Sequence, residues 1–286
     1  MKTSFKKQRS IFLTLMAIVA LYSCSNEEVA MEDPTAATLD QELTARDAQI
    51  DIATDEVNSI VETVYFNDEL ESTDPASRSG MSPSNFLPDC VTITTVVTAT
   101  TREKTIDFGD GCELPNGNVL SGIIYMSYAK DMEAATKTIS VSFENFFVNE
   151  INIAGSMSRL RQRANDANNP QSTINVDITV TWPDQSFASR LGTKVREWVA
   201  GVGSGTWGDN VYLITGSWTS TFRNGTVHSG EVVEPLRREL ACLFLVSGTI
   251  DLQRNDATAT LDFGDGSCDN TASLTLSNGE VLEITL

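Results

Sequence analysis

The chain has 286 residues, of which 39 are acidic and 20 basic, and its formal net charge at neutral pH is −19. A surface this negative repels nucleic acid and anionic lipid headgroups, so both are excluded as partners. The length is sufficient for one large β domain or two small domains.

The first 23 residues have the pattern of a bacterial signal peptide. Residues 1–10 contain four basic residues and no acidic one, and the apolar run over residues 11–22 is too short to span a bilayer as a helix. Residues 21–24 (LYSC) match the lipobox, whose cysteine is diacylated before cleavage. We therefore expect a lipid on Cys24, because several acyl chains give lasting attachment. The alternative is a secreted protein in which Cys24 follows the signal by chance.

An acidic tetrapeptide, residues 25–28 (SNEE), follows the expected lipidation site. It resembles the tag behind the lipidated cysteine of surface-exposed lipoproteins in the Bacteroidetes. The sequence thus predicts an outer-membrane lipoprotein at the cell surface. An anchor that faces the periplasm is the alternative, since so short a motif also occurs by chance.

Residues 24–89 are expected to form an acidic tether between the lipid and the folded domain. Val57, Ile60, Val61 and Val64 fall at helical spacing among acidic residues, which predicts one amphipathic helix over about residues 51–70. The stretch from residue 72 to 88 is rich in Ser, Pro and Gly and is typical of a linker. Together these segments are predicted to hold the domain away from the membrane.

From Cys90 onward the hydrophobic period changes to two. Residues 174–182 alternate apolar with polar side chains, as expected for a strand with one wet face, and three Asn-Gly pairs predict hairpin turns. We expect residues 90–286 to form an all-β domain, an antiparallel meander of about a dozen strands. A sandwich, an open barrel and a long twisted sheet are all consistent with this pattern.

Four cysteines remain after Cys24, in two similar segments that end in TIDFGDGC and TLDFGDGSC. An even number in an exported chain indicates disulfides, and the lack of a CxxC pair and the single histidine argue against zinc. In each segment the chain turns back as a hairpin and brings its ends together. The expected bonds are therefore Cys90–Cys112 and Cys242–Cys268. The alternative joins Cys90 to Cys268 and Cys112 to Cys242.

Five stretches of the chain carry a resemblance to a known family. They are TIDFGDGC, TVTWPDQSFASRLGTKVREW, GTWGDNVYLITGSWTSTFRNG, LRRELACLFLVSG and ATLDFGDGSCDN. They resemble a family of lipoproteins from the Bacteroidetes, chiefly flavobacteria, over roughly residues 85–286. The resemblance implies a lipid-anchored β protein and implies no activity.

The repeated DFGDG segments also contain candidate calcium ligands. Asp107 and Asp110 lie in the first, and Asp262, Asp265 and Asp269 lie in or just after the second. A calcium loop that starts at Asp265 would need an acid eleven residues on, where the chain has a leucine. The simpler interpretation is that Asp-Gly forms a tight turn at the end of a strand, and no metal site is assigned.

Three further features are candidates for catalysis or binding. His228, the sole histidine, follows a predicted hairpin turn and is expected to be exposed. The glycine-rich segment over residues 201–205 lacks the Lys-Ser/Thr ending of a phosphate loop and predicts a flexible loop. Trp198 and Trp207 flank that loop; they would stack on sugar rings if exposed, and otherwise pack as anchors.

Two functions remain open on this evidence. The first is a non-catalytic surface or structural module that binds a glycan, a protein or the envelope itself. The second is a hydrolase that acts on a glycan or another envelope substrate through a pair of carboxylates. We favour the first, because catalysis needs a nucleophile or base that the sequence does not single out. No catalytic residue and no cofactor is assigned, and the expected partners are the membrane, through the lipid, and a glycan or protein ligand.

Overall fold

The computed structural model describes residues 41–73 and 79–286; the signal peptide, Cys24 and the SNEE tag lie outside these residues. One long helix, α1 (Gln41–Ser72), precedes all the strands, and a short 3-10 helix, η1 (Trp207–Asp209), lies between two of them. The strands are β1 (Thr92–Val97), β2 (Thr101–Asp107), β3 (Cys112–Glu113), β4 (Val119–Ala129), β5 (Thr136–Val148), β6 (Ile151–Gln162), β7 (Gln171–Thr181), β8 (Phe187–Ala200), β9 (Val211–Phe222), β10 (Val227–Glu239), β11 (Leu245–Arg254), β12 (Ala257–Asp265), β13 (Thr271–Leu276) and β14 (Val281–Thr285).

The strands form one 14-stranded antiparallel sheet in which nearly every strand pairs with the next along the chain. Only the two-residue β3 lies off this path, where it pairs with β4. The predicted antiparallel meander is therefore confirmed, and the described strands form one sheet that is not closed. β1 and β14 form the two edges of the described sheet.

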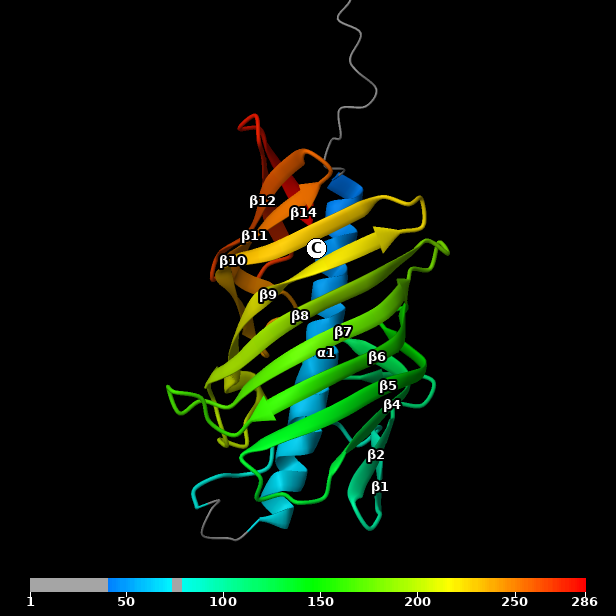
Figure 1. Ribbon diagram of the computed structural model, residues 1–286, viewed down its shortest axis with the longest axis vertical. Helices are drawn as coiled ribbons and strands as arrows, with labels where there is room; N and C mark the ends of the chain where they lie inside the picture. The colour runs from blue at the N-terminus through cyan, green and yellow to red at the C-terminus, as the bar shows by residue number, and fades with distance from the viewer. Residues whose placement is uncertain (1–40, 74–78) are drawn as a thin grey trace, which may run out of the picture. The chain divides into compact units, whose positions relative to one another are not determined.

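Helix α1 runs along the inner face of this sheet, and the long central strands cross it obliquely (Figure 1). The helix is longer at both ends than the predicted 51–70 and is buried along most of its length. The prediction that it forms part of a tether is therefore wrong, since it is the central element of the domain. Among the described residues, no helix combines the length and apolar character needed to cross a membrane.

The apolar side of α1 forms a core with the inward side chains of the sheet. Ile50, Val57, Ile60, Val61 and Val64 pack in one cluster with residues that include Ile106, Leu120, Ile124, Ile139, Phe146, Ile153, Ile174 and Val180. A second cluster joins Ala48 to the inward residues of strands β9–β14. Burial of each large apolar side chain contributes roughly 1.5–3 kcal/mol, so this core stabilises the helix within the sheet.

The described part of the predicted linker, residues 79–88, is held against the domain. The backbone N–H of Ser82 donates to the carbonyl of Gly203 at 2.8 Å, and that of Ser84 donates to the side chain of Asn67 at 2.8 Å. Phe86 is fully buried. This segment therefore fastens the C-terminal part of α1 to the loop between β8 and β9.

Both predicted disulfides are present with the predicted pairing. Cys90 bonds Cys112 with a Cα–Cα separation of 5.8 Å, and Cys242 bonds Cys268 with 5.7 Å. Both separations lie within the range that a disulfide tolerates. Each bond closes a hairpin near one edge of the sheet, β1–β2 in one case and β11–β12 in the other.

Candidate functional site

The largest set of ionisable groups in the described chain lies between α1 and the sheet. Most of the acidic residues of α1 fall at spacings of four or seven, which places them along neighbouring rows of the helix. The buried acids of the helix are Asp47, Asp51, Asp55, Glu56, Glu62, Asp68 and Glu69. Burial of so many charges is costly unless each has a partner.

The partners are basic residues on the inner face of the sheet. They occupy alternate positions in their strands, and therefore point to the same side as the neighbouring apolar residues. The basic residues that contact the helix acids are Arg102, Lys104, Arg159, Arg161, Arg163, Arg190, Lys194, Arg196, His228 and Arg238. The interface is thus an acidic helix inside a basic sheet face.

The first group of pairs lies near the start of α1. Arg190 bridges two helix acids: its Nη2 lies 2.6 Å from Asp47 Oδ1, and its Nη1 pairs with Asp51, which Lys194 also contacts. His228 Nδ1 lies 2.8 Å from the other oxygen of Asp47. Burial opposes ionisation of Asp47, but the hydrogen bond with His228 and the charge of Arg190 outweigh it and lower the pKa of that carboxyl.

The expectation that His228 is exposed is wrong. Its ring is fully buried, edge-on to Phe222 at 5.2 Å between ring centres. The side chain points inward because of its register position in β10, where it lies opposite the inward-facing Ser220 of β9. It therefore serves the contact between sheet and helix and does not face an open site.

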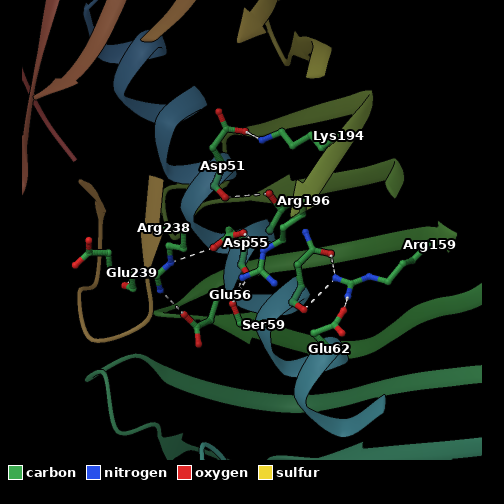
Figure 2. A network of polar contacts seen from close by, with 12 residues as sticks. Asp51, Asp55, Glu56, Ser59, Glu62, Arg159, Lys194, Arg196, Arg238 and Glu239 are labelled. Carbon is green, nitrogen blue, oxygen red and sulfur yellow. Dashed lines mark hydrogen bonds and ion pairs between the residues drawn. The ribbon is translucent and has the colours of Figure 1, made fainter. Parts of the chain in front are cut away.

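The middle of the interface centres on two adjacent acids of α1 (Figure 2). Asp55 lies between two guanidinium groups, with Nε of Arg196 and Nε of Arg238 each 3.0 Å from one of its oxygens. Arg238 also reaches Glu56, whose Oε2 accepts hydrogen bonds at 2.9 Å from the amides of Asn116 and Asn118. Residues from β8, β10 and the β3–β4 turn thus meet at one turn of the helix.

The last three turns of α1 are held by three arginines of β6 and the loop after it. Glu62 pairs with Arg159 at 2.5 Å and with Arg161 at 2.8 Å. Arg161 then reaches Glu69 at 3.2 Å, and Arg163 binds the same carboxylate at 3.0 Å. The arginines and acids therefore alternate along the helix axis as a chain of pairs.

Asp68 forms a separate cluster with the strands near the β1 edge. Its carboxylate accepts hydrogen bonds from Arg102 at 2.9 Å, Lys104 at 2.7 Å and the hydroxyl of Tyr128 at 2.7 Å. Burial opposes its ionisation, but these hydrogen bonds and the nearby charge lower the pKa of Asp68. Burial, together with the bond to Asp68, raises the pKa of Tyr128.

Two buried acids of the helix, Glu56 and Glu62, have pKa values shifted in opposite directions. Burial raises the pKa of Glu56, and the single guanidinium of Arg238 and the amide donors do not compensate for it. Burial also opposes ionisation of Glu62, but the two charges of Arg161 and Arg159 outweigh it and lower the pKa of Glu62. In turn, burial lowers the pKa of Arg159 to about 10. The number of cationic partners decides the sign of the shift.

Aromatic rings cover several of the cationic groups. The guanidinium carbon of Arg196 lies 3.3 Å from the ring centre of Tyr212, and that of Arg190 lies 4.7 Å from the ring centre of Trp218. Such cation–π contacts strengthen when water is excluded. The charged groups are thereby shielded from water between α1 and the sheet. There they neutralise one another, and their pairing fixes the orientation of the helix.

The outer face of the sheet has a different character. Side chains with hydroxyl groups are register partners on neighbouring strands: Ser140 lies opposite Ser127 and Ser158, and Ser217 lies opposite Thr193. A groove of about 1010 Å³ crosses strands β7–β13, and a second hollow of about 600 Å³ crosses β1–β7. The charged residues that line the larger groove are acidic, Glu231 and Asp251.

The aspartates of the DFGDG segments form turns, as the simpler interpretation predicted. The side chain of Asp107 accepts a hydrogen bond from the N–H of Gly109, and that of Asp262 accepts one from Gly264, both at 2.8 Å. In the part of the chain that the structure covers, histidine, cysteine and acidic side chains do not gather into a metal-binding group.

The tryptophans and the glycine-rich loop take structural positions. Trp198 is buried, stacks on Tyr212 and meets Phe66 edge-on. Trp207 packs beside Phe86. The loop over residues 201–205 receives backbone hydrogen bonds from the segment after α1, so it fastens this segment to the sheet.

Sequence reasoning missed the basic lining of the sheet. The signal was present: Arg159, Arg161 and Arg163, and likewise Arg190, Lys194 and Arg196, recur at even spacing within strands. In β8 they share their parity with the buried Ala188 and Trp198, which places them on the inner face. Bases on that face indicate an acidic partner inside the sheet.

The chain matches no family model, no curated protein and no solved structure.

Proposed function

We propose that the protein is a lipid-anchored outer-membrane lipoprotein, displayed at the cell surface, that acts as a non-catalytic binding or structural module. The observation that carries this proposal is the position of α1 against the inner face of the sheet. The helix is the first described element after the expected lipidation site, and ion pairs from β2, β6, β8 and β10 hold its acids. The domain is thus built around the segment that leads to the anchor.

This arrangement suits an anchored module better than an enzyme. The buried carboxylates bind guanidinium, ammonium or amide groups of the same chain, and the one histidine is bound to Asp47 inside the interface. A general acid or base must instead reach a substrate directly or through one water. The ionisable groups of this interface serve the attachment of helix to sheet.

The groove on the outer face is the binding surface that we propose. Hydroxyl groups from several strands, among them Thr193, Ser217, Thr219 and Ser229, line it. Hydroxyl groups both donate and accept hydrogen bonds, and the acidic residues of the groove repel anions. The groove therefore suits a neutral chain rich in hydroxyl groups, such as a glycan.

The anchor is tested by labelling cells with a radioactive fatty acid. The wild-type chain and the control variant Ser23→Ala should incorporate label and fractionate with the membrane, because the small residue before the cysteine is kept. Cys24→Ala should incorporate none. Label that persists in Cys24→Ala would refute the anchor.

Surface display is tested in the same cells with an external protease. Replacement of Asn26, Glu27 and Glu28 by Ala should leave the lipid in place but protect the domain from the protease. Equal digestion of both proteins on intact cells would show that the tag has no role in export to the surface.

The groove is tested by electrophoresis in gels that contain a neutral glucan or the anionic polysaccharide alginate. The glucan should retard the wild-type chain and alginate should not. Thr219→Trp, which fills the groove, should abolish the retardation, whereas Thr221→Trp, on the same face but outside the groove, should keep it. Unchanged mobility of the wild-type chain in glucan would contradict the proposal.

A further inference from the structure

The two edges of the sheet are finished differently. At one edge, β14 has Ile284 buried, and the carbonyl of Glu283 accepts a hydrogen bond from the side chain of Gln41 in α1. At the other edge, all six residues of β1 are exposed. Ile93, Val96 and Val97 are 41%, 54% and 55% exposed although they are large and apolar. β1 is therefore exposed along its whole length, whereas part of β14 is covered.

The backbone of β1 offers unused hydrogen-bonding groups in a fixed pattern. The N–H of Thr98 donates to the carbonyl of Thr101 at 2.9 Å, so Thr98 points its backbone groups toward β2. Backbone direction alternates along a strand, and Ile93, Thr95 and Val97 therefore point their N–H and C=O groups away from β2. In residues 41–73 and 79–286, no strand pairs with this side of β1.

The sequence of β1 itself has none of the usual protection of an edge strand. Proteins commonly block edge pairing with charged residues, proline or a bulge. Residues 90–101 contain no charged residue and no proline, and β1 pairs with β2 in an unbroken register. An edge that is apolar, regular and open is suited to receive another strand.

We propose that β1 is an interface between two copies of this chain, in which their β1 strands pair antiparallel about a two-fold axis at Thr95. In this register, Thr95 faces Thr95 of the second copy, and Ile93 faces Val97 of the second copy. Each of these pairs uses the outward backbone groups of β1 and exchanges two hydrogen bonds. The two sheets would then continue as one.

The side chains of β1 are self-complementary in that register. Ile93 would meet Val97 of the second copy on one face, and Thr94 would meet Val96 of the second copy on the other. β-branched residues placed directly opposite each other stabilise an antiparallel pair. In an antiparallel pair about a two-fold axis, odd-numbered residues pair with odd-numbered ones. With the axis at Thr95, all three residues whose backbone groups point away from β2 (Ile93, Thr95 and Val97) form hydrogen bonds across the interface.

Charge favours a second copy at this place and disfavours it elsewhere. The chain has a net charge of −19, so two copies repel each other across most of their surface. The uncharged strand β1 and the turn after it are the segment at which they approach with the least repulsion. A C2 contact of this kind closes on itself and does not grow into fibres, because β14 remains outside it.

The experiment is cysteine cross-linking of the lipidated chain in intact cells, read on non-reducing gels. Opposite residues in a hydrogen-bonded pair have Cα atoms about 5.5 Å apart, within disulfide range. Thr95→Cys should therefore give a disulfide-linked dimer. The residue of Val96→Cys is one position away and faces Thr94 of the second copy. The two introduced cysteines are then only diagonal neighbours, so the dimer band should be at least about tenfold weaker.

A second variant checks the interface without a cross-link. Thr95→Pro removes an N–H that β2 does not use, so the hairpin should remain folded, as proline is tolerated on the open side of an edge strand. The wild-type chain, extracted in detergent, should sediment as a dimer, and Thr95→Pro as a monomer with unchanged circular dichroism.

Results of three kinds, from cross-linking and sedimentation, would overturn the proposal. The first is equal cross-linking of Thr95→Cys and Val96→Cys, which would indicate random collision. The second is a cross-link from Thr95→Cys to a different protein, which would assign the edge to another partner. The third is a wild-type chain that sediments as a monomer, or a Thr95→Pro variant that sediments as a dimer.

Discussion

Arg159 Nη1 lies 2.5 Å from Glu62 Oε2, although the two residues are 97 positions apart and their side chains are only 1% and 6% exposed. A buried pair of this kind contributes little when compared with two well-packed apolar residues, because both charges must leave water. Loss of one member, however, leaves the other charge buried and alone. The interface between α1 and the sheet is made of such pairs, so its stability depends on each of them.

We expect Glu62→Gln to lower the free energy of unfolding by about 3–5 kcal/mol, because Arg159 and Arg161 lose their shared carboxylate. Glu133→Gln removes an exposed carboxylate 3.9 Å from Arg163 and should cost no more than about 1 kcal/mol. Urea unfolding at neutral pH measures both. Equal costs in the two variants would show that burial does not amplify the pairing.

Acid should weaken the interface through the acids whose pKa is lowered. Asp47, Glu62 and Asp68 contribute stability that is fully present above their unfolded pKa values of about 4 and is lost as the pH falls through the lower folded values. The cost of Glu62→Gln should therefore shrink as the pH falls below about 4. Urea unfolding as a function of pH measures this, and a cost that is independent of pH would contradict it.

Glu56 should show the opposite trend, because its pKa is raised. Its carboxyl contributes stability below the unfolded pKa of about 4, and this contribution is lost as the pH rises through the folded value. The free energy of unfolding of Glu56→Gln, taken relative to that of the wild type, should therefore be higher at pH 7 than at pH 4. A difference of the opposite sign would mean that Arg238 outweighs the burial of this carboxyl.

Gly230→Ala should disturb the aromatic cover of Arg190. A Cβ at Gly230 would lie 2.4 Å from a ring atom of Trp218, and that ring is packed against Arg190 and Lys194. We expect a loss of about 1–3 kcal/mol and a shifted tryptophan fluorescence maximum. At Gly208 the nearest atom is an alanine Cβ at 3.9 Å, so Gly208→Ala serves as the control and should leave both properties unchanged.

Removal of the second disulfide, by Cys242→Ala together with Cys268→Ala, should lower the free energy of unfolding by about 3 kcal/mol. The closed loops are similar in length, with sequence separations of 26 and 22, so the Cys90–Cys112 pair should contribute a similar amount. Chemical denaturation of both double variants gives the comparison. A variant as stable as the wild type would show that the hairpin is held by packing alone.

The sequence predicted local features of the fold and missed the main tertiary one. The period of two, the Asn-Gly turns and the paired cysteines depend on neighbours along the chain, and the strands and disulfides followed from them. The position of α1 depends on contacts between residues more than 90 positions apart, such as Arg159 with Glu62. An acidic helix before a β domain is equally consistent with a solvated tether, so local pattern alone could not separate the two.

The functional residues show the same limit. His228 follows a turn, and from the sequence this position indicated exposure, but helix α1 covers it from 181 positions away. The outer groove is lined by residues from several strands, and no single segment carries a motif for it.

The order of the chain has a consequence for how the protein folds. Helix α1 is synthesised before any strand, yet Asp55 pairs with Arg238, which lies 183 positions later in the chain. Folding must therefore close very long loops before the helix charges are neutralised, which makes it slow. A chain that ends before β10 would lack Arg238, so Asp55 would keep its pair with Arg196 and lose the second guanidinium group.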